Sequence, residues 1–245
     1  MLLEIIIATV IVSLVSLVGI SLLSLNKKTM DTIVFLILSF AIGTLLAAAF
    51  FDLLPEAIAK LDSSSVFTTT LVGIMAFFIL ERIVHWHHEH HDHAKHEKPV
   101  AWLVLIGDGI HNFFDGVAIA ASFLTSMEVG ITTTLAIIVH EIPQELSDFT
   151  LLRYAGFSTR KALAFNLLSA VTAIIGAVLF YYLASQVRNF EPYGLAFAAG
   201  AFIYIAGTDL LPELHKEEEN SKSVIQLIAM ICGIITIWLV VNILK

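Results

Sequence analysis

Eight long apolar runs, separated by short polar or turn-forming stretches, account for almost the whole chain. A helix needs about 20 predominantly apolar residues to cross the hydrocarbon core of a bilayer, and each run is long enough to do so. The pattern predicts eight transmembrane helices, at residues 2–23, 32–54, 67–86, 100–125, 128–153, 160–185, 192–214 and 223–244. We therefore expect an all-α membrane protein with a single transmembrane domain over residues 1–245.

Composition agrees with a chain that lies almost entirely in lipid. Hydrophobic residues make up 58% of the 245, and the mean hydropathy is +0.90. The net charge of -8 argues against a nucleic-acid partner and suits a protein that handles cations. Cys232 is the single cysteine, which excludes an intramolecular disulfide. The first residues carry Glu4 and no basic stretch, so they are interpreted as a first membrane helix rather than a cleaved signal peptide.

Basic residues gather in alternate connections between the predicted helices. Three of the 13 lie in the even-numbered connections or at the C-terminus, namely Lys60, Arg188 and Lys245. The other ten lie in or beside the odd-numbered connections, at Lys27, Lys28, Arg82, Lys95, Lys98, Arg153, Arg160, Lys161, Lys216 and Lys222. Because basic loops stay in the cytoplasm, this asymmetry predicts that both termini lie outside.

The pentapeptide DLLPE occurs twice, at residues 52–56 near the end of the second helix and 209–213 near the end of the seventh. Chance, combined with the common use of proline after a helix, is the simple explanation. The alternative is an inverted repeat, the plan of many secondary transporters, because these two helices run in opposite directions. Helices one to three would then pair with six to eight around helices four and five, a 3+2+3 arrangement. The acidic residues would lie at opposite mouths of one pathway: Asp52, Glu56, Asp209 and Glu213.

The two central helices carry polar residues in the middle of their apolar spans. His111 lies roughly 16 Å and His140 roughly 18 Å from the start of its helix, so both are near the bilayer midplane. At about 100° per residue, two polar stripes follow. One contains Asp108, His111, Asn112 and Asp115, and the other contains His140, Glu141, Gln144, Glu145 and Asp148.

Facing stripes of imidazole, carboxylate and amide oxygen predict a divalent-cation site. Imidazole and carboxylate suit Zn²⁺ and its first-row neighbours. Ionised carboxylates at the bilayer centre cost about 2.5–3.5 kcal/mol each on insertion scales, and neither span interior holds a Lys or Arg to offset them. A bound cation would do so, and a proton relay is the competing explanation. Pro143 adds a kink beside this cluster.

The motifs HNFFDG, residues 111–116, and HEIPQE, residues 140–145, resemble the signatures of the ZIP family of metal-ion transporters. The resemblance implies uptake of a divalent metal toward the cytoplasm, usually Zn²⁺, with Fe²⁺, Mn²⁺ or Cd²⁺ as other cargoes and no separate cofactor. It implies metal ligands at His111, Asn112, Asp115, His140, Glu141 and Gln144, with Glu145 as a ligand or close neighbour. Asp108 and Asp148, which share the polar stripes, are expected to serve the pathway. Gln144 stands where His or Glu is common, and Phe114 where some relatives have proline, so a second metal is in question.

A histidine-rich stretch, residues 85–99, follows the third predicted helix. Its histidines include His87, His88, His90, His91 and His93. Such tracts bind metals weakly and flexibly, so the stretch is either a cytoplasmic metal trap or a solvated linker.

Two other functions compete with transport. An intramembrane metalloprotease would need HExxH, and Gln144 stands where the second histidine belongs, so we expect no enzyme. A membrane metal sensor would bind metal without moving it. The absence of a long polar domain suggests a prokaryotic plasma membrane, and a homodimer is left open.

Overall fold

A computed structural model describes residues 1–18, 27–89, 97–154, 156–187, 190–214 and 220–244, and every regular element within them is helical. The α-helices are α1 (Leu2–Val15), α3 (Lys27–Ala48), α4 (Leu54–Lys60), α5 (Ser63–Glu89), α6 (Glu97–Thr125), α7 (Met127–Tyr154), α8 (Thr159–Ala170), α9 (Thr172–Ala184), α10 (Phe190–Tyr204), α11 (Leu211–Leu214) and α12 (Asn220–Leu244). A 3₁₀ turn, η1 (Ser16–Val18), follows α1, and two π-helical turns, η2 (Ala49–Leu53) and η3 (Ile205–Leu210), join neighbouring helices.

Each of the eight predicted segments is mostly helical where the structure describes it, with the sixth broken by a turn at Val171, and the fold is an all-α membrane protein. Within the described residues, four segments are both long and apolar enough to cross a membrane, namely Phe35–Lys60, Ser63–Arg82, Thr159–Ala184 and Ser223–Ile243. Helix α1 is apolar but short, with residues 19–23 of its predicted span outside the described residues. Helices α6 and α7 contain the polar stripes, which lower their hydropathy.

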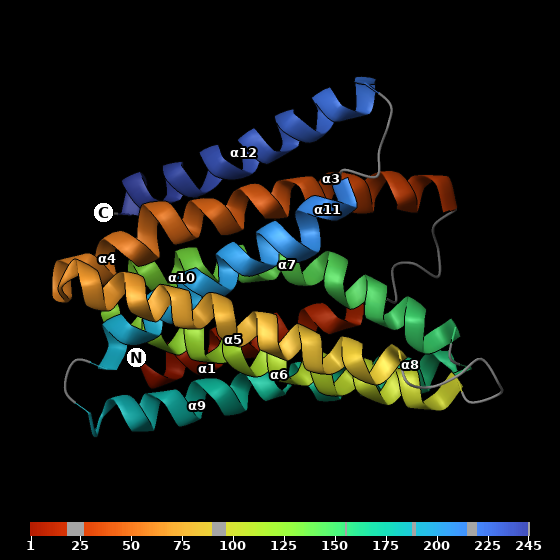
Figure 1. The fold of residues 1–245 in the computed structure, drawn as a ribbon, viewed down its shortest axis with the longest axis horizontal. Coiled ribbons are helices and arrows are strands. Elements are labelled where there is room, and N and C mark those ends of the chain that lie inside the picture. The colour runs from red at the N-terminus through yellow and green to blue at the C-terminus, as the bar shows by residue number, and fades with distance from the viewer. Residues whose placement is uncertain (19–26, 90–96, 155, 188–189, 215–219, 245) are drawn as a thin grey trace.

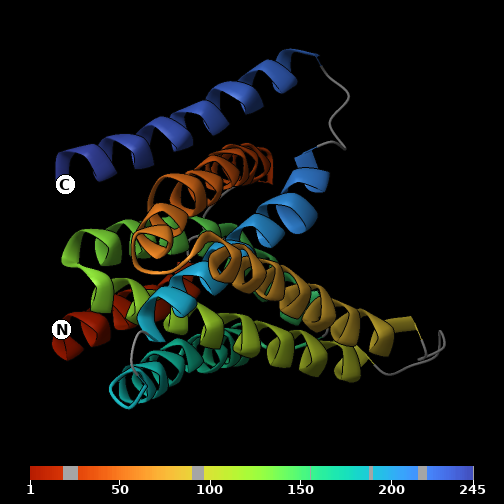
Figure 2. The same cartoon turned by 60° about the vertical axis from the view of Figure 1, so that its left-hand side comes forward.

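The helices form two groups that meet along α6 and α7. In one group, α1 contacts α6, α7, α8 and α9, and α6 packs on α7, α8 and α9. In the other, α12 packs on α3, α5 packs on α10, and α3 contacts α10. Contacts of α7 with α3 and of α6 with α10 join the groups. Helices α12 and α9 lie at opposite edges of the bundle in both views (Figures 1 and 2), and both chain ends lie at the same end of it. The two helices with the polar stripes therefore run through the centre of the molecule.

The second predicted helix does not stop at its DLLPE sequence. It continues through the π turn η2 and helix α4 to Lys60, so the prediction of an end at residue 54 was wrong. A proline inside an α-helix clashes with the carbonyl four residues earlier. Here the N–H of Leu54 bonds to the carbonyl of Ala49, five residues back, and this wider turn admits Pro55 near the start of α4. The helix therefore passes the proline without breaking.

The second DLLPE copy has the same local structure. The N–H of Leu211 bonds to the carbonyl of Ala206, again five residues back, and Pro212 follows inside α11. In Figure 1, α3 leads into α4 from right to left, whereas α10 leads into α11 from left to right. The two copies thus share a π turn before the proline and lie on helices of opposite direction.

Close helix contacts also repeat between the two halves. A Cβ on Gly43 of α3 would lie 2.1 Å from the carbonyl oxygen of Met230 on α12. A Cβ on Gly200 of α10 would lie 2.1 Å from the carbonyl oxygen of Thr70 on α5. Each of these glycines stands nine residues before the aspartate of its DLLPE. The same position therefore lets a neighbouring backbone approach in both copies.

Two other helix boundaries differ from the prediction for clear local reasons. The third helix begins at Ser63 rather than 67, because Asp62 accepts hydrogen bonds from the backbone N–H of Ser65 at 2.9 Å and from its hydroxyl at 2.6 Å. These bonds keep the pKa of the exposed Asp62 carboxyl below its usual range, so the cap stays ionised. The sixth helix is interrupted at Val171, where the Thr172 hydroxyl bonds back to the carbonyl of Ser169 at 2.6 Å.

Candidate metal centre

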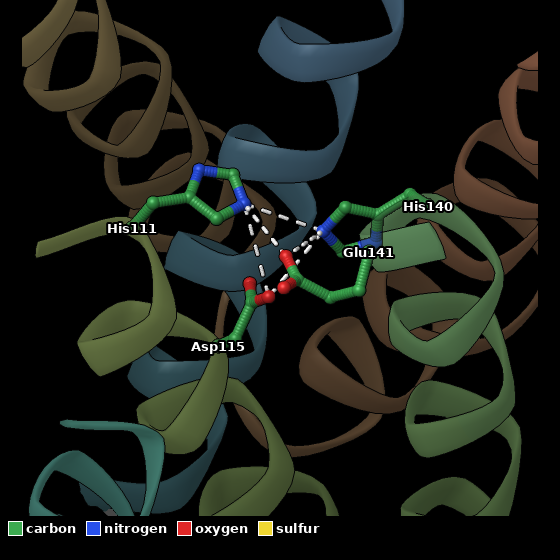
Figure 3. Close-up of side chains that lie close together, drawn as sticks. All are labelled: His111, Asp115, His140 and Glu141. Atoms are coloured by element: carbon green, nitrogen blue, oxygen red, sulfur yellow. Dashed lines mark hydrogen bonds and ion pairs between the residues drawn. The ribbon is translucent and has the colours of Figure 1, made fainter. Parts of the chain in front are cut away.

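Four buried side chains from the two central helices converge on one point (Figure 3). His111 and Asp115 lie one turn apart on α6, and His140 and Glu141 are neighbours on α7. Each offers one ligand atom, and these atoms all lie within 4.8 Å of one another. Exposure is 8% for His111 and 2% or less for the other three. This group is called the central cluster below.

The spacing inside the central cluster matches a tetrahedral ion site. His140 Nε2 lies 3.3 Å from His111 Nε2, 3.3 Å from Asp115 Oδ2 and 3.3 Å from Glu141 Oε1. His111 Nε2 lies 3.5 Å from Glu141 Oε1 and 3.8 Å from Asp115 Oδ2. With metal–ligand distances of about 2.0–2.1 Å, tetrahedral ligands lie roughly 3.3 Å apart. These five distances are close to those around a zinc ion, and all four donor atoms lie within 4.8 Å of one another.

Hydrogen bonding prepares His140 to act as a ligand. Its Nδ1 lies 3.2 Å from the carbonyl oxygen of Ala136, and a carbonyl can only accept, so Nδ1 carries the proton. In the neutral ring Nε2 then holds a free lone pair directed at the central cluster. The Phe202 ring, with its centroid 6.1 Å from that of the imidazole, packs against the same side chain. The ring orientation is thus set before any ion arrives.

The carboxylates of the central cluster are poorly satisfied by the protein alone. Asp115 Oδ2 and both carboxylate oxygens of Glu141 are buried and accept no hydrogen bond. Buried polar atoms are normally hydrogen-bonded, and an unpaired buried charge is expensive. Metal ligation requires neutral imidazoles and ionised carboxylates, which together would present two negative charges to an ion. A divalent cation would neutralise that charge and occupy the unsatisfied oxygens.

Asn112 and Gln144, both predicted ligands, form hydrogen bonds with the carboxylate of Asp108. Their amide nitrogens donate to Asp108 Oδ1, Asn112 at 3.0 Å and Gln144 at 3.2 Å. We call these three residues the amide-clamped aspartate. Gln144 and Glu141 were both predicted as ligands, and the structure brings Glu141 to the two histidines while the Gln144 amide bonds to Asp108. The reason is that Asp108 attracts the amide of Gln144 away.

Glu145 faces a different helix. The side-chain amide of Asn166 on α8 donates to Glu145 Oε2 at 2.6 Å and to the Glu145 backbone carbonyl at 3.1 Å. Both residues are fully buried. Asn166 was not singled out in the sequence, although an amide in the interior of an apolar span was a usable signal. The contact fixes α8 to the helix that carries His140 and Glu141.

The other candidate residues that the structure describes are not members of the central cluster. Asp148 is half-buried on α7, Asp52 is buried in η2, and Glu56 is half-buried on α4. Asp209 belongs to η3 and Glu213 to α11. His87 and His88 belong to the last turn of α5, which ends at Glu89. The predicted loop of residues 85–99 is therefore helical over its first five residues. The other predicted loop ligands, His90, His91 and His93, lie outside the described residues.

Comparison with known proteins gives the family. The model described as "ZIP Zinc transporter" matches residues 2–101 and 85–240. The human protein named zinc transporter ZIP10 is 43% identical over 124 residues, which cover 50% of this chain and 15% of that protein. Zinc transporter foi of Drosophila melanogaster is 40% identical over 136 residues, or 55% of this chain and 19% of that protein.

A third relative is matched over more of its length. Zinc transporter ZIP13 of Pongo abelii is 35% identical over 214 residues, which cover 81% of this chain and 64% of that protein. The chain thus spans less than two thirds of each of these relatives, and less than a fifth of the first two. The family match nevertheless extends over nearly all of the present sequence, including both central helices. The chain belongs to the ZIP zinc transporter family.

Proposed function

We propose that this protein carries divalent metal ions, zinc foremost, across a membrane toward the cytoplasm. The observation that carries the proposal is the near-tetrahedral spacing of four buried donors from α6 and α7. Family membership supports it, as do the names of the three relatives, each called a zinc transporter. Fe²⁺, Mn²⁺ and Cd²⁺ accept the same imidazole and carboxylate ligands, so they are secondary cargoes in this proposal.

In this proposal the ion is held by His111, Asp115, His140 and Glu141 and leaves past further polar groups. Asp108 begins this set one turn before His111 on α6, and Glu145 and Asp148 continue it along α7. Under the predicted orientation, these residues lie on the cytoplasmic side of the central cluster. A metal leaving the cluster would meet carboxylates and amides in that direction. The direction of transport is the one that the family resemblance implies, and this arrangement of polar groups is consistent with it.

We further propose eight membrane crossings in an inverted 3+2+3 arrangement that makes one domain of residues 1–245. The shared π turns and the equivalent glycine contacts of α3 and α10 support a repeat. Asp52, Glu56, Asp209 and Glu213 would then face the mouths of the pathway, and the histidine-rich stretch would collect metal in the cytoplasm. The prokaryotic plasma membrane stays a prediction from sequence, and the three relatives come from animals.

Uptake of radioactive zinc into liposomes that contain the purified protein tests the function. Saturable uptake, inhibited by excess unlabelled zinc and absent from protein-free liposomes, is the expected result. Competition by iron, manganese and cadmium in the same assay ranks the cargoes. A membrane metal sensor would bind zinc with no uptake. An intramembrane protease would cleave membrane-protein substrates in the presence of zinc, without transport.

The topology makes a separate prediction. In a variant with Cys232 replaced by serine, a cysteine at Ser64 should react with a membrane-impermeant thiol reagent in intact cells. A cysteine at Ala94 should react only after permeabilisation, because the basic residues around it place it in the cytoplasm. The reverse pattern would invert the orientation and with it the proposed direction of transport.

Gln144 should limit the protein to one tightly bound midplane ion. Its amide donates to Asp108 Oδ1, so it offers no negative charge to a second cation. The change Gln144→Glu would place a carboxylate against Asp108, and their repulsion would be relieved by a second divalent ion. We expect metal stoichiometry, measured by calorimetry, to rise from one to about two zinc ions per chain.

The control for this change is Gln144→Met, which removes the amide without adding charge. It should leave the stoichiometry at one. Both measurements use a background lacking residues 87–96, so that the histidine-rich stretch contributes no zinc. Two equally occupied midplane ions in the protein with Gln144 intact would show that this residue does not limit the site.

A further inference from the structure

An apolar groove runs along the outer side of α6, where this helix meets α8 and α9. Its volume is about 580 Å³, and it is lined by Leu105, Ile106, Gly109, Ile110, Phe113, Phe114, Phe165, Leu168, Ser169, Thr172 and Ile175. At roughly 100° per residue, Gly109 and Phe113 lie on the face of α6 opposite to His111. The groove is therefore directly behind the helix that carries half of the central cluster, and it is separate from that cluster.

The walls of the groove are exposed although they are strongly apolar. Ile106 is 58% exposed, Leu168 63% and Ile175 57%. These residues belong to helices embedded in a membrane, so the medium at this surface is lipid hydrocarbon. Its floor contains few polar groups, and the Thr172 hydroxyl there already donates to the carbonyls of Gly109 and Ser169. Such a surface suits a hydrocarbon chain rather than a polar ligand.

The length of the groove matches one leaflet of a bilayer. Its lining spans residues 105–114 on α6 and 165–175 across α8 and α9. At a rise of 1.5 Å per residue, these stretches are roughly 14–15 Å long. The hydrocarbon core of a bilayer is about 30 Å thick, so one leaflet contributes about 15 Å. An acyl chain that enters from one membrane surface would thus fill the groove and end near the midplane.

A pair of basic residues stands at one end of the groove. Arg160 and Lys161 are exposed in the first turn of α8, about one turn before the lining residue Phe165. Lys161 Nζ lies 5.7 Å from the centroid of the Phe165 ring and 4.4 Å from that of Phe157. The ammonium group is thereby held at the mouth of the groove while remaining open to solvent. Basic side chains at a membrane surface attract anionic lipid headgroups.

We propose that this groove is a binding site for an anionic phospholipid. One acyl chain lies between α6 and the α8–α9 pair, and the phosphate of the headgroup pairs with Arg160 and Lys161. The acyl chain of the lipid passes over the interruption at Val171, where the sixth predicted helix changes from α8 to α9. A bound lipid would therefore brace an interrupted helix against the rear of α6 and raise the thermal stability of the protein.

Native mass spectrometry of the detergent-purified protein tests the site. The protein is mixed with equal amounts of phosphatidylglycerol and phosphatidylcholine, and the lipid that stays bound is counted. We expect one phosphatidylglycerol per chain to be retained in preference to phosphatidylcholine. Neutralising Arg160 or Lys161 with glutamine should weaken this retention roughly fivefold each, in line with the usual attraction of a basic side chain to anionic lipid. Lys60→Gln, an exposed charge on α4, should leave it unchanged.

A matched pair of variants tests the acyl-chain part of the site. Ile175→Trp should obstruct the groove and abolish both retention and the rise in Tm on adding phosphatidylglycerol. Leu179→Trp, one turn farther along α9 and 48% exposed, should change neither. Equal retention of the two lipids, or equal behaviour of the two tryptophan variants, would show that lipid binds non-specifically around the protein. Either result would overturn the proposal. So would dissociation of a dimer by Ile175→Trp, because the groove would then be covered by a second copy.

Discussion

Replacing His140 with alanine should abolish saturable zinc uptake and weaken zinc binding by at least about 100-fold, since losing even the partner of a ligand commonly costs 10- to 100-fold. His140 Nε2 lies closest to the other donor atoms of the central cluster, at 3.3 Å from His111 Nε2, Asp115 Oδ2 and Glu141 Oε1. No neighbouring side chain can replace it, because Gln144 and Asn112 are bonded to Asp108. Zinc affinity by calorimetry and uptake by liposomes, at equal amounts of folded protein, are the measurements.

The control for His140→Ala is Thr134→Ala on the same helix. Thr134 is also buried, and its hydroxyl donates to the carbonyl of Gly130 at 2.7 Å, away from the central cluster. This loss should cost about 1 kcal/mol of stability with near-normal uptake. If the central cluster were only a structural network of charges, His140→Ala would lower stability and leave zinc affinity unchanged. That result would move the transport site elsewhere.

The change Gly116→Val should destabilise the protein by about 3 kcal/mol or more, at the upper end of the usual cost of overpacking. A Cβ at Gly116 would lie 1.8 Å from the carbonyl oxygen of Ala173 on α9 and 2.6 Å from its carbonyl carbon. These are backbone atoms, so the helices themselves must separate. Gly116 follows Asp115 directly, and the shift should therefore also disturb the central cluster. A fall in Tm together with weaker zinc binding is expected.

Gly109→Ala is the matched control, on the same helix and against the same neighbouring segment. Its Cβ would meet the nearest atoms, in Thr172 and Ser169, at 3.7 Å or more, which is ordinary contact. Alanine also favours a helix over glycine by about 1 kcal/mol. We expect an unchanged or slightly higher Tm. A similar loss of stability in both variants would mean that α6 tolerates no side chain at either position, whatever the distance to α9.

Hydrophobic pattern and helical spacing were sufficient to predict the eight helical segments, though not all of their ends, and the pairing of α6 with α7. His111, Asp115, His140 and Glu141 meet as two facing stripes require. Periodicity gives the face of a helix on which a residue lies. It does not give the partner that a side chain selects among several on that face. The roles of Gln144 and Glu145 depended on Asp108 and on Asn166 of α8, so they needed the tertiary structure.

The irregular turns within the helices could not be predicted from the pattern of apolar residues either. Proline commonly follows a helix, so Pro55 predicts a helix end, yet a turn with a hydrogen bond to the carbonyl five residues back carries the helix past it. The interruption at Val171 depends on the hydroxyls of Ser169 and Thr172, which look like tolerated polar residues in an apolar span. Both features arise from local hydrogen bonding that competes with the regular helix.

The paired π turns also bear on the history of the chain. A π turn contains one more residue than the α-helical turn it replaces, so inserting one residue into a regular helix would produce it. The insertions occupy equivalent places in η2 and η3, immediately before the same proline. Two independent insertions at matching positions are less economical than one insertion in a shorter ancestor that was later duplicated. If the proposed inverted repeat holds, the two halves diverged after the wide turn was acquired, and each kept the turn together with its DLLPE sequence.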